Sequence, residues 1–114
     1  MPFLHVRTSV ALDANKREAL GSEIAAIMSI LPGKTRDNTM MQIDGGASLS
    51  MGDAGAPCAF VDIRLFKASP GDAKSRFVRA ITDILKERLG VDPARVYVNL
   101  IELPDWGARG ERME

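Results

Sequence analysis

The sequence predicts a single α/β (α+β) domain, made of two βαβ units that share a four-stranded sheet with both helices on one face. Strand, helix and strand patterns occur twice along the 114 residues, and each helical segment carries a single apolar stripe. Residues 1–114 are enough for one hydrophobic core and too few for two. Parallel pairing within each half requires a right-handed crossover, which lays the helix of that half on one face of the sheet.

The first unit begins with residues 3–10, where apolar or β-branched side chains alternate as in a strand. Asp13 stands where an N-cap is expected, ahead of a helix over residues 14–31. A proline–glycine pair then ends this helix, and residues 39–44 are predicted to form the second strand. The apolar stripe of the helix recurs at helical spacing and consists of Leu20, Ile24, Ile27, Met28 and Leu31.

The second unit follows a loop rich in glycine and serine over residues 45–57, in which a short strand is expected at residues 49–51. Residues 58–66 are mostly apolar and predict the third strand. Ser69 as N-cap and Pro70 at the first helical position are typical of a helix start. The helix is expected to end at Leu89, with a buried stripe of Phe77, Ile81, Ile84, Leu85 and Leu89.

The last strand is predicted over residues 96–102, and the chain beyond Pro104 has the composition of a polar tail. A sheet that carries both helices on one side has an uncovered second face. In a chain this short, we expect another copy of the same chain to cover it.

The composition excludes several functional classes. Lys plus Arg and Asp plus Glu number 15 each, which argues against nucleic-acid binding and favours self-association. Cys58 and His5 are the only residues of their types, so one chain forms neither a zinc site nor a disulfide. We therefore expect no metal and no cofactor. The sequence shows no membrane-length apolar stretch and no signal-peptide pattern, so the expected location is the cytoplasm, with non-classical secretion left open.

Pro2 becomes a secondary amine at the chain terminus once Met1 is removed, and aminopeptidases remove methionine before small residues such as proline. An α-amino group has an ordinary pKa of about 7.7–8.0. Burial or a nearby lysine disfavours the protonated amine and lowers this pKa. A neutral amine near pH 7 is a usable general base. Taken alone, a proline in second position is most often a coincidence.

Four segments of the sequence, which are spaced as in a known protein family, change that interpretation. The sequence resembles macrophage migration inhibitory factor and its bacterial relatives, which belong to the tautomerase superfamily, over most of its length. The segments that carry the resemblance are Pro2-Phe3-Leu4, Gly33-Lys34, Pro57-Cys58-Ala59 and the stretch from Asp92 to Asn99. The resemblance implies a homotrimer with two βαβ units per subunit, whose sheets enclose a central channel, and an active site where subunits meet.

The resemblance also implies site residues and a reaction, the keto–enol tautomerisation of α-keto acids such as phenylpyruvate. Pro2 is expected to act as the general base. The expected substrate-binding residues are Lys34 for the carboxylate, the backbone of Phe66, Tyr97 and Asn99 from an adjacent subunit, and Trp106 as a pocket wall. Tyr97 and Asn99 are two apart on a strand and therefore share a face. For Trp106, a plain surface position is an equal alternative.

Two other functions stay open. A superfamily decarboxylase or hydratase adds an acidic or arginine partner to the proline; Arg36 and Asp37 lie near the right place, but the arginine pair expected at residues 68–71 is absent. A non-enzymatic signalling or binding trimer can retain the same residues. Cys58 is followed by Val61 at the position of the second cysteine of the animal cytokines, so thiol–disulfide exchange of that type is not expected.

Overall fold

The computed structural model describes residues 1–52 and 55–113. Its main elements, in chain order, are β1 (Pro2–Thr8), α1 (Ala14–Ile27), β2 (Met40–Asp44), β3 (Ala59–Phe66), α2 (Gly71–Leu89) and β4 (Val96–Leu103). Two short strands, β5 (Gly107–Ala108) and β6 (Glu111–Arg112), follow, and 3₁₀ turns occupy Met28–Ile30 and Pro93–Arg95.

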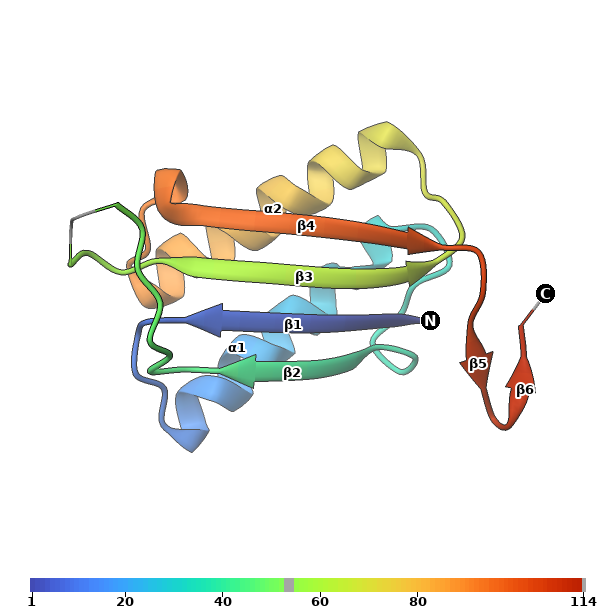
Figure 1. Cartoon of the computed structure of the whole chain (residues 1–114), viewed down its shortest axis with the longest axis horizontal. Coiled ribbons are helices and arrows are strands. Elements are labelled where there is room, and N and C mark those ends of the chain that lie inside the picture. Colours follow the sequence, from blue (N-terminus) through green and yellow to red (C-terminus); the bar gives the residue numbers. More distant parts are fainter. Residues whose placement is uncertain (53–54, 114) are drawn as a thin grey trace.

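The four long strands form one mixed sheet in the order β2-β1-β3-β4. Strands β1 and β2 are parallel, as are β3 and β4, while the central pair β1–β3 is antiparallel. Both helices lie against the same face of this sheet (Figure 1). The predicted pair of βαβ units with a one-sided helical layer is therefore confirmed.

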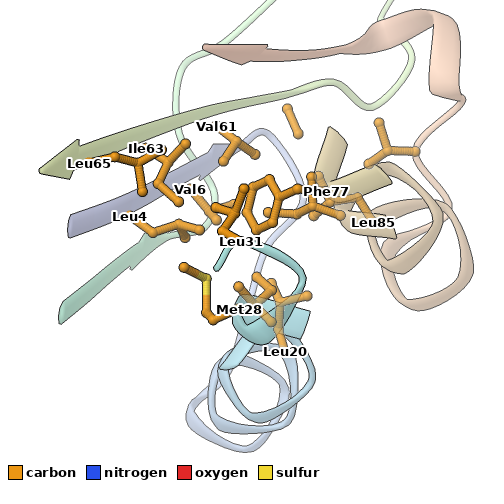
Figure 2. Close-up of a cluster of buried hydrophobic side chains, with 14 of the residues drawn as sticks. Leu4, Val6, Leu20, Met28, Leu31, Val61, Ile63, Leu65, Phe77 and Leu85 are labelled. Atoms are coloured by element: carbon orange, nitrogen blue, oxygen red, sulfur yellow. The ribbon is translucent and has the colours of Figure 1, made fainter. Parts of the chain in front are cut away.

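The hydrophobic core lies between the sheet and the two helices (Figure 2). Strand alternation decides which side chains enter it: Leu4, Val6 and Thr8 of β1 are fully buried, while the residues between them are half-buried on the other face. In β3, Val61, Ile63 and Leu65 are likewise fully buried. The stripes of the helices complete the core with Leu20, Ile24, Met28, Phe77, Ile81 and Leu85, all at most 1% exposed.

The helix ends differ in part from the prediction. Asp13 caps α1 by accepting a hydrogen bond from the Lys16 backbone N–H, as expected. The helix gives way to a 3₁₀ turn at Met28, so residues 14–31 are not one continuous α-helix. Ser69 does not cap α2: the N-cap position is Pro70, and the backbone N–H of Ser69 donates to the Glu102 carboxylate instead.

The chain end, predicted as a polar tail, is mostly exposed but is not without regular structure: it forms a β-hairpin that was not predicted. Strands β5 and β6 pair around Arg109 and Gly110, which both have positive φ. Two central residues with positive φ form the type of two-residue hairpin turn whose twist matches that of the flanking strands. The Met113 N–H closes the hairpin by donating to the Trp106 carbonyl at 2.7 Å. In the loop at residues 45–57, the predicted strand is reduced to one bridge residue, Met51.

The sheet face opposite the helices carries a chain of polar contacts across all four strands. From β4 to β2, Asn99 donates to Asp62 (3.4 Å), Arg7 donates to Asp62 (3.0 Å) and to His5 (3.3 Å), and His5 contacts Asp44 (2.7 Å). Within the described ranges, no helix covers this face (Figure 1). No helix of the described chain is both long and apolar enough to span a membrane.

Gly45→Ala is expected to destabilise the fold by about 1–3 kcal/mol, because an added methyl overpacks a tight contact. A Cβ at Gly45 would lie 2.5 Å from Cγ of Leu12. Gly55→Ala is the matched control, since a Cβ there meets nothing within 4 Å. Urea unfolding measures both; equal midpoints for the two variants would contradict the prediction.

Candidate active site

The candidate site lies at the end of the sheet where β1 begins and β3 ends, beside the amino terminus in Figure 1. The antiparallel register pairs Pro2 with Leu65, so the terminus is adjacent to Phe66 at the end of β3. Lys34, from the loop after α1, reaches the same place: its Nζ donates to the Phe66 carbonyl at 3.2 Å. The fold thus brings together Pro2, Lys34 and Phe66, which are far apart in the sequence.

The amino terminus lies in surroundings that disfavour a positive charge. Burial, followed by the nearby Lys34 ammonium, lowers the pKa of the Met1 amino group from its ordinary value. Pro2 itself is buried and Met1 half-buried. An amine at this end of β1 therefore loses its proton more readily than an exposed terminus.

The turn after β3 is held by its neighbour β4. Lys67 has φ +67°, and its backbone N–H donates to the Leu103 carbonyl at 3.0 Å. The Lys67 ammonium lies over the Phe66 ring, 5.1 Å from the ring centroid. This turn fixes the Phe66 carbonyl that accepts from Lys34.

Glu102 is a residue of this region that the sequence reasoning missed. On β4 it pairs with Leu65, on the side of the sheet that faces the helices. Its carboxylate accepts from Lys74 Nζ at 2.8 Å and from the Ser69 N–H. The Lys74 hydrogen bond and then the Ser69 N–H lower the Glu102 pKa. The sequence feature that could have identified Glu102 is an acidic side chain at a helix-facing position of a mostly apolar strand.

Glu102→Gln is expected to lower the melting temperature at pH 7 and to have little effect in acid. A carboxyl with a lowered folded pKa stabilises the fold above its ordinary pKa of 4.5. That stabilisation is lost as the pH falls below 4.5 and through the folded pKa. Melting curves from pH 3 to 7 measure the difference, with Asp37→Asn in an exposed loop as control. A difference in melting temperature between wild type and Glu102→Gln that did not change with pH would contradict this link between the Glu102 pKa and stability.

Tyr97 and Asn99 lie on the opposite face of the sheet from the buried Pro2 side chain. They pair with Phe60 and Asp62, whereas Pro2 pairs with Leu65. At about 3.3 Å per residue, Asp62 and Leu65 are ~10 Å apart along β3. Tyr97 is 58% exposed. One chain therefore does not bring these two side chains to Pro2.

Trp106 is half-buried in the connection between β4 and the terminal hairpin. This connection leaves the sheet at the end where the amino terminus lies (Figure 1). Arg36 and Asp37 are both exposed, and Arg36 donates to the Ser22 carbonyl at 3.4 Å. Across residues 1–52 and 55–113, no three His, Cys, Asp or Glu side chains are grouped to hold a metal ion.

Comparisons with known proteins place this geometry in a family. The model of the macrophage migration inhibitory factor family matches residues 1–112. MIF2 of Leishmania major is similar in structure, with a TM-score of 0.89, 25% identity and coverage of 99% of this chain and 97% of that one.

A homologue from Prochlorococcus marinus has a TM-score of 0.79 and 19% identity, covering 98% of this chain and 99% of its own. A third structure, described as inactivated by 2-oxo-3-pentynoate, has a TM-score of 0.81 and 17% identity, with coverage of 95% and 92%. A search of curated proteins finds no match. Since the family model spans nearly the whole sequence, the chain belongs to the macrophage migration inhibitory factor family, whose fold it shares.

Proposed function

We propose that this protein is a keto–enol tautomerase of α-keto acids such as phenylpyruvate, with the Pro2 amine as general base after removal of Met1. The observation that carries the proposal is the convergence at one end of the sheet. There, burial and Lys34 lower the pKa of the Met1 amine, which directly precedes Pro2, and Lys34 itself contacts the Phe66 carbonyl. While Met1 is attached, the Pro2 nitrogen is an amide and takes up no proton, so processing is part of the proposal.

The reaction follows from these groups. The substrate carboxylate accepts from Lys34 Nζ, the same atom that donates to the Phe66 carbonyl. Neutral Pro2 removes a proton from the carbon beside the ketone; the C–H electrons form the C=C bond, and the ketone oxygen becomes an enolate. Protonated Pro2 then returns the proton to that oxygen, so substrate and product are isomers. Positioning and electrostatic stabilisation supply most of the rate enhancement in such a site.

A homotrimer with the site between subunits is part of the same proposal. Tyr97 and Asn99 lie too far from Pro2 to act with it within one chain, and the sheet face that carries them has no cover among the described elements. When a second copy of the chain packs on this face, Tyr97 and Asn99 of one subunit reach the Pro2 site of the other. The uncovered face is the support for this arrangement.

A keto acid as substrate is supported by a structural neighbour. The neighbour inactivated by 2-oxo-3-pentynoate reacts with a compound whose carboxylate lies next to a ketone. Phenylpyruvate has the same 2-oxo acid group. A lysine ammonium beside a terminal amine suits this group, because the ammonium pairs with the carboxylate and leaves the amine facing the carbon next to the ketone.

The experiment combines intact mass with two assays. Mass spectrometry is expected to show loss of Met1, and the wild type is expected to interconvert the enol and keto forms of phenylpyruvate. Turnover of malonate semialdehyde without enol–keto activity would indicate the decarboxylase instead. Absence of both activities, with Met1 removed, would leave a binding or signalling trimer and would contradict the proposal.

A further inference from the structure

The turn between β3 and α2 is attached to the end of β4 by two backbone N–H groups. The Lys67 N–H donates to the Leu103 carbonyl at 3.0 Å, and the Ser69 N–H donates to the Glu102 carboxylate. The connection from β3 to α2 runs past the end of β4, where both acceptors lie (Figure 1). The path of this turn therefore depends on one backbone group and on one side chain, that of Glu102.

The same turn sets the direction of the carbonyl group that contacts Lys34. The Phe66 carbonyl accepts from Lys34 Nζ at 3.2 Å, and it belongs to the peptide group that joins Phe66 to Lys67. This peptide is planar, so the backbone angles on either side of it orient the carbonyl. Lys67 has φ +67°, which is disfavoured for a residue with a Cβ and persists only where surrounding contacts hold it. Release of the turn would therefore move the acceptor of Lys34.

Glu102 is itself held in place as a charged group. Lys74 Nζ on α2 donates to its carboxylate at 2.8 Å, so Glu102 joins β4, the turn and α2. The hydrogen bonds from Lys74 and from the Ser69 N–H lower the Glu102 pKa, and the Lys34 ammonium adds to this lowering. An ionised carboxylate accepts stronger hydrogen bonds than a neutral group. Glu102 is thus connected to Lys34 both through the turn and electrostatically.

We infer that Glu102 is a positioning residue of the proposed active site: it holds the turn after β3 so that the Phe66 carbonyl keeps Lys34 Nζ where a substrate carboxylate binds. This inference rests on the proposed function, since it assigns a supporting role at the same site. Glu102 acts through Lys34 and takes no part in the proton transfer. Because Lys34 pairs with the carboxylate in the ground state and in the transition state alike, loss of Glu102 weakens substrate binding without slowing the chemical step.

The kinetic experiment measures kcat and KM for phenylpyruvate in the wild type, Glu102→Gln and Glu23→Gln, at a pH where activity has levelled off and the base is fully neutral. Glu102→Gln is expected to raise KM about fivefold, less than the tenfold or more for outright loss of a hydrogen bond to a charged group, with kcat within about twofold. Glu23→Gln is the matched control, because Glu23 also loses an ion pair to α2, that with Arg88. Both constants are expected to stay within about twofold in this control.

A double-mutant cycle with Lys34→Ala separates positioning from a general loosening of the fold. Once Lys34 is absent, Glu102→Gln is expected to have little further effect on KM, because residues that act through one another are not additive. An equal rise in KM with and without Lys34, or a fall in kcat at unchanged KM, would overturn the inference and leave the proposed function intact. Melting curves of each variant show that it is folded at the assay temperature.

The ¹³C resonance of the Phe66 carbonyl gives a second measurement that needs no turnover. Lys34→Ala is expected to shift this resonance, because the carbonyl loses its donor. Glu102→Gln is expected to shift it in the same direction by a smaller amount, and Glu23→Gln to leave it at the wild-type position. If the wild type turns over no keto acid, the proposed function fails, and the carbonyl resonance still decides the inference. An unchanged resonance in Glu102→Gln would show that Glu102 does not position Lys34.

Discussion

Pro2→Gly is expected to lower kcat/KM for phenylpyruvate by about 10²-fold, the lower end of the range for loss of a general base. The effect is at the lower end because a terminal amine remains, on a more flexible backbone. A stricter variant keeps Pro2 but precedes it with a serine that remains after Met1 removal. The Pro2 nitrogen is then an amide, and the loss is expected to approach about 10⁴-fold. Steady-state kinetics measure both, and an unchanged rate in the extended chain would exclude Pro2 as the base.

The pH profile gives the control for this prediction. Since the neutral amine is the active form, kcat/KM is expected to rise with pH through the amine pKa and then level off. Burial and Lys34 both lower the pKa of the Met1 amine in this place. We expect the same two causes to act on the Pro2 amine after processing. Lys34→Ala removes the second cause, so its profile is expected to rise at higher pH than that of the wild type. A shift to lower pH would contradict this electrostatic assignment.

Phe77→Ala is expected to cost about 3–5 kcal/mol of folding free energy. Phe77 on α2 is completely buried and is among the largest fully buried side chains of the core (Figure 2). Removing the ring leaves a cavity between the helix and the sheet in addition to the lost transfer energy. Since domains are typically stable by about 5–15 kcal/mol, this is a large part of the total.

Urea unfolding measures this loss and is carried out at a fixed protein concentration, because the stability of the proposed trimer would depend on concentration. Arg76→Ala, an exposed neighbour on the same helix, is the control and is expected to stay within about 0.5 kcal/mol. A similar, small loss for the two variants would show that Phe77 does not support the core.

Much of the fold follows from periodicity that is local in the sequence. Alternation indicated that Leu4, Val6, Thr8 and Val10 share a face; the first three are at 0% exposure, whereas Val10 lies beyond the end of β1 and is half-buried. Helical spacing identified Phe77, Ile81 and Leu85, which are also at 0% exposure, together with Ile84 and Leu89, which are half-buried. These patterns can be found because burial of one face needs no information from the rest of the chain.

Contacts between distant residues were not predictable in this way. The strongest example is Ser69, whose sequence context is typical of a helix cap, but whose N–H donates to Glu102, 33 residues further on. The terminal hairpin was missed because Arg109 is not a usual residue for a turn position with positive φ. The contact of Lys34 with Phe66 follows from the resemblance to a family and the fold together, since no local pattern joins a loop after α1 to the end of β3.

The central claim concerns one nitrogen atom, and ¹⁵N nuclear magnetic resonance of proline-labelled mature protein observes it directly. A titration followed at Pro2 is expected to show loss of the proton at a pH below the ordinary α-amino range of about 7.7–8.0. Loss of the proton within or above that range, or a Pro2 nitrogen that does not titrate because Met1 is still attached, would contradict the account.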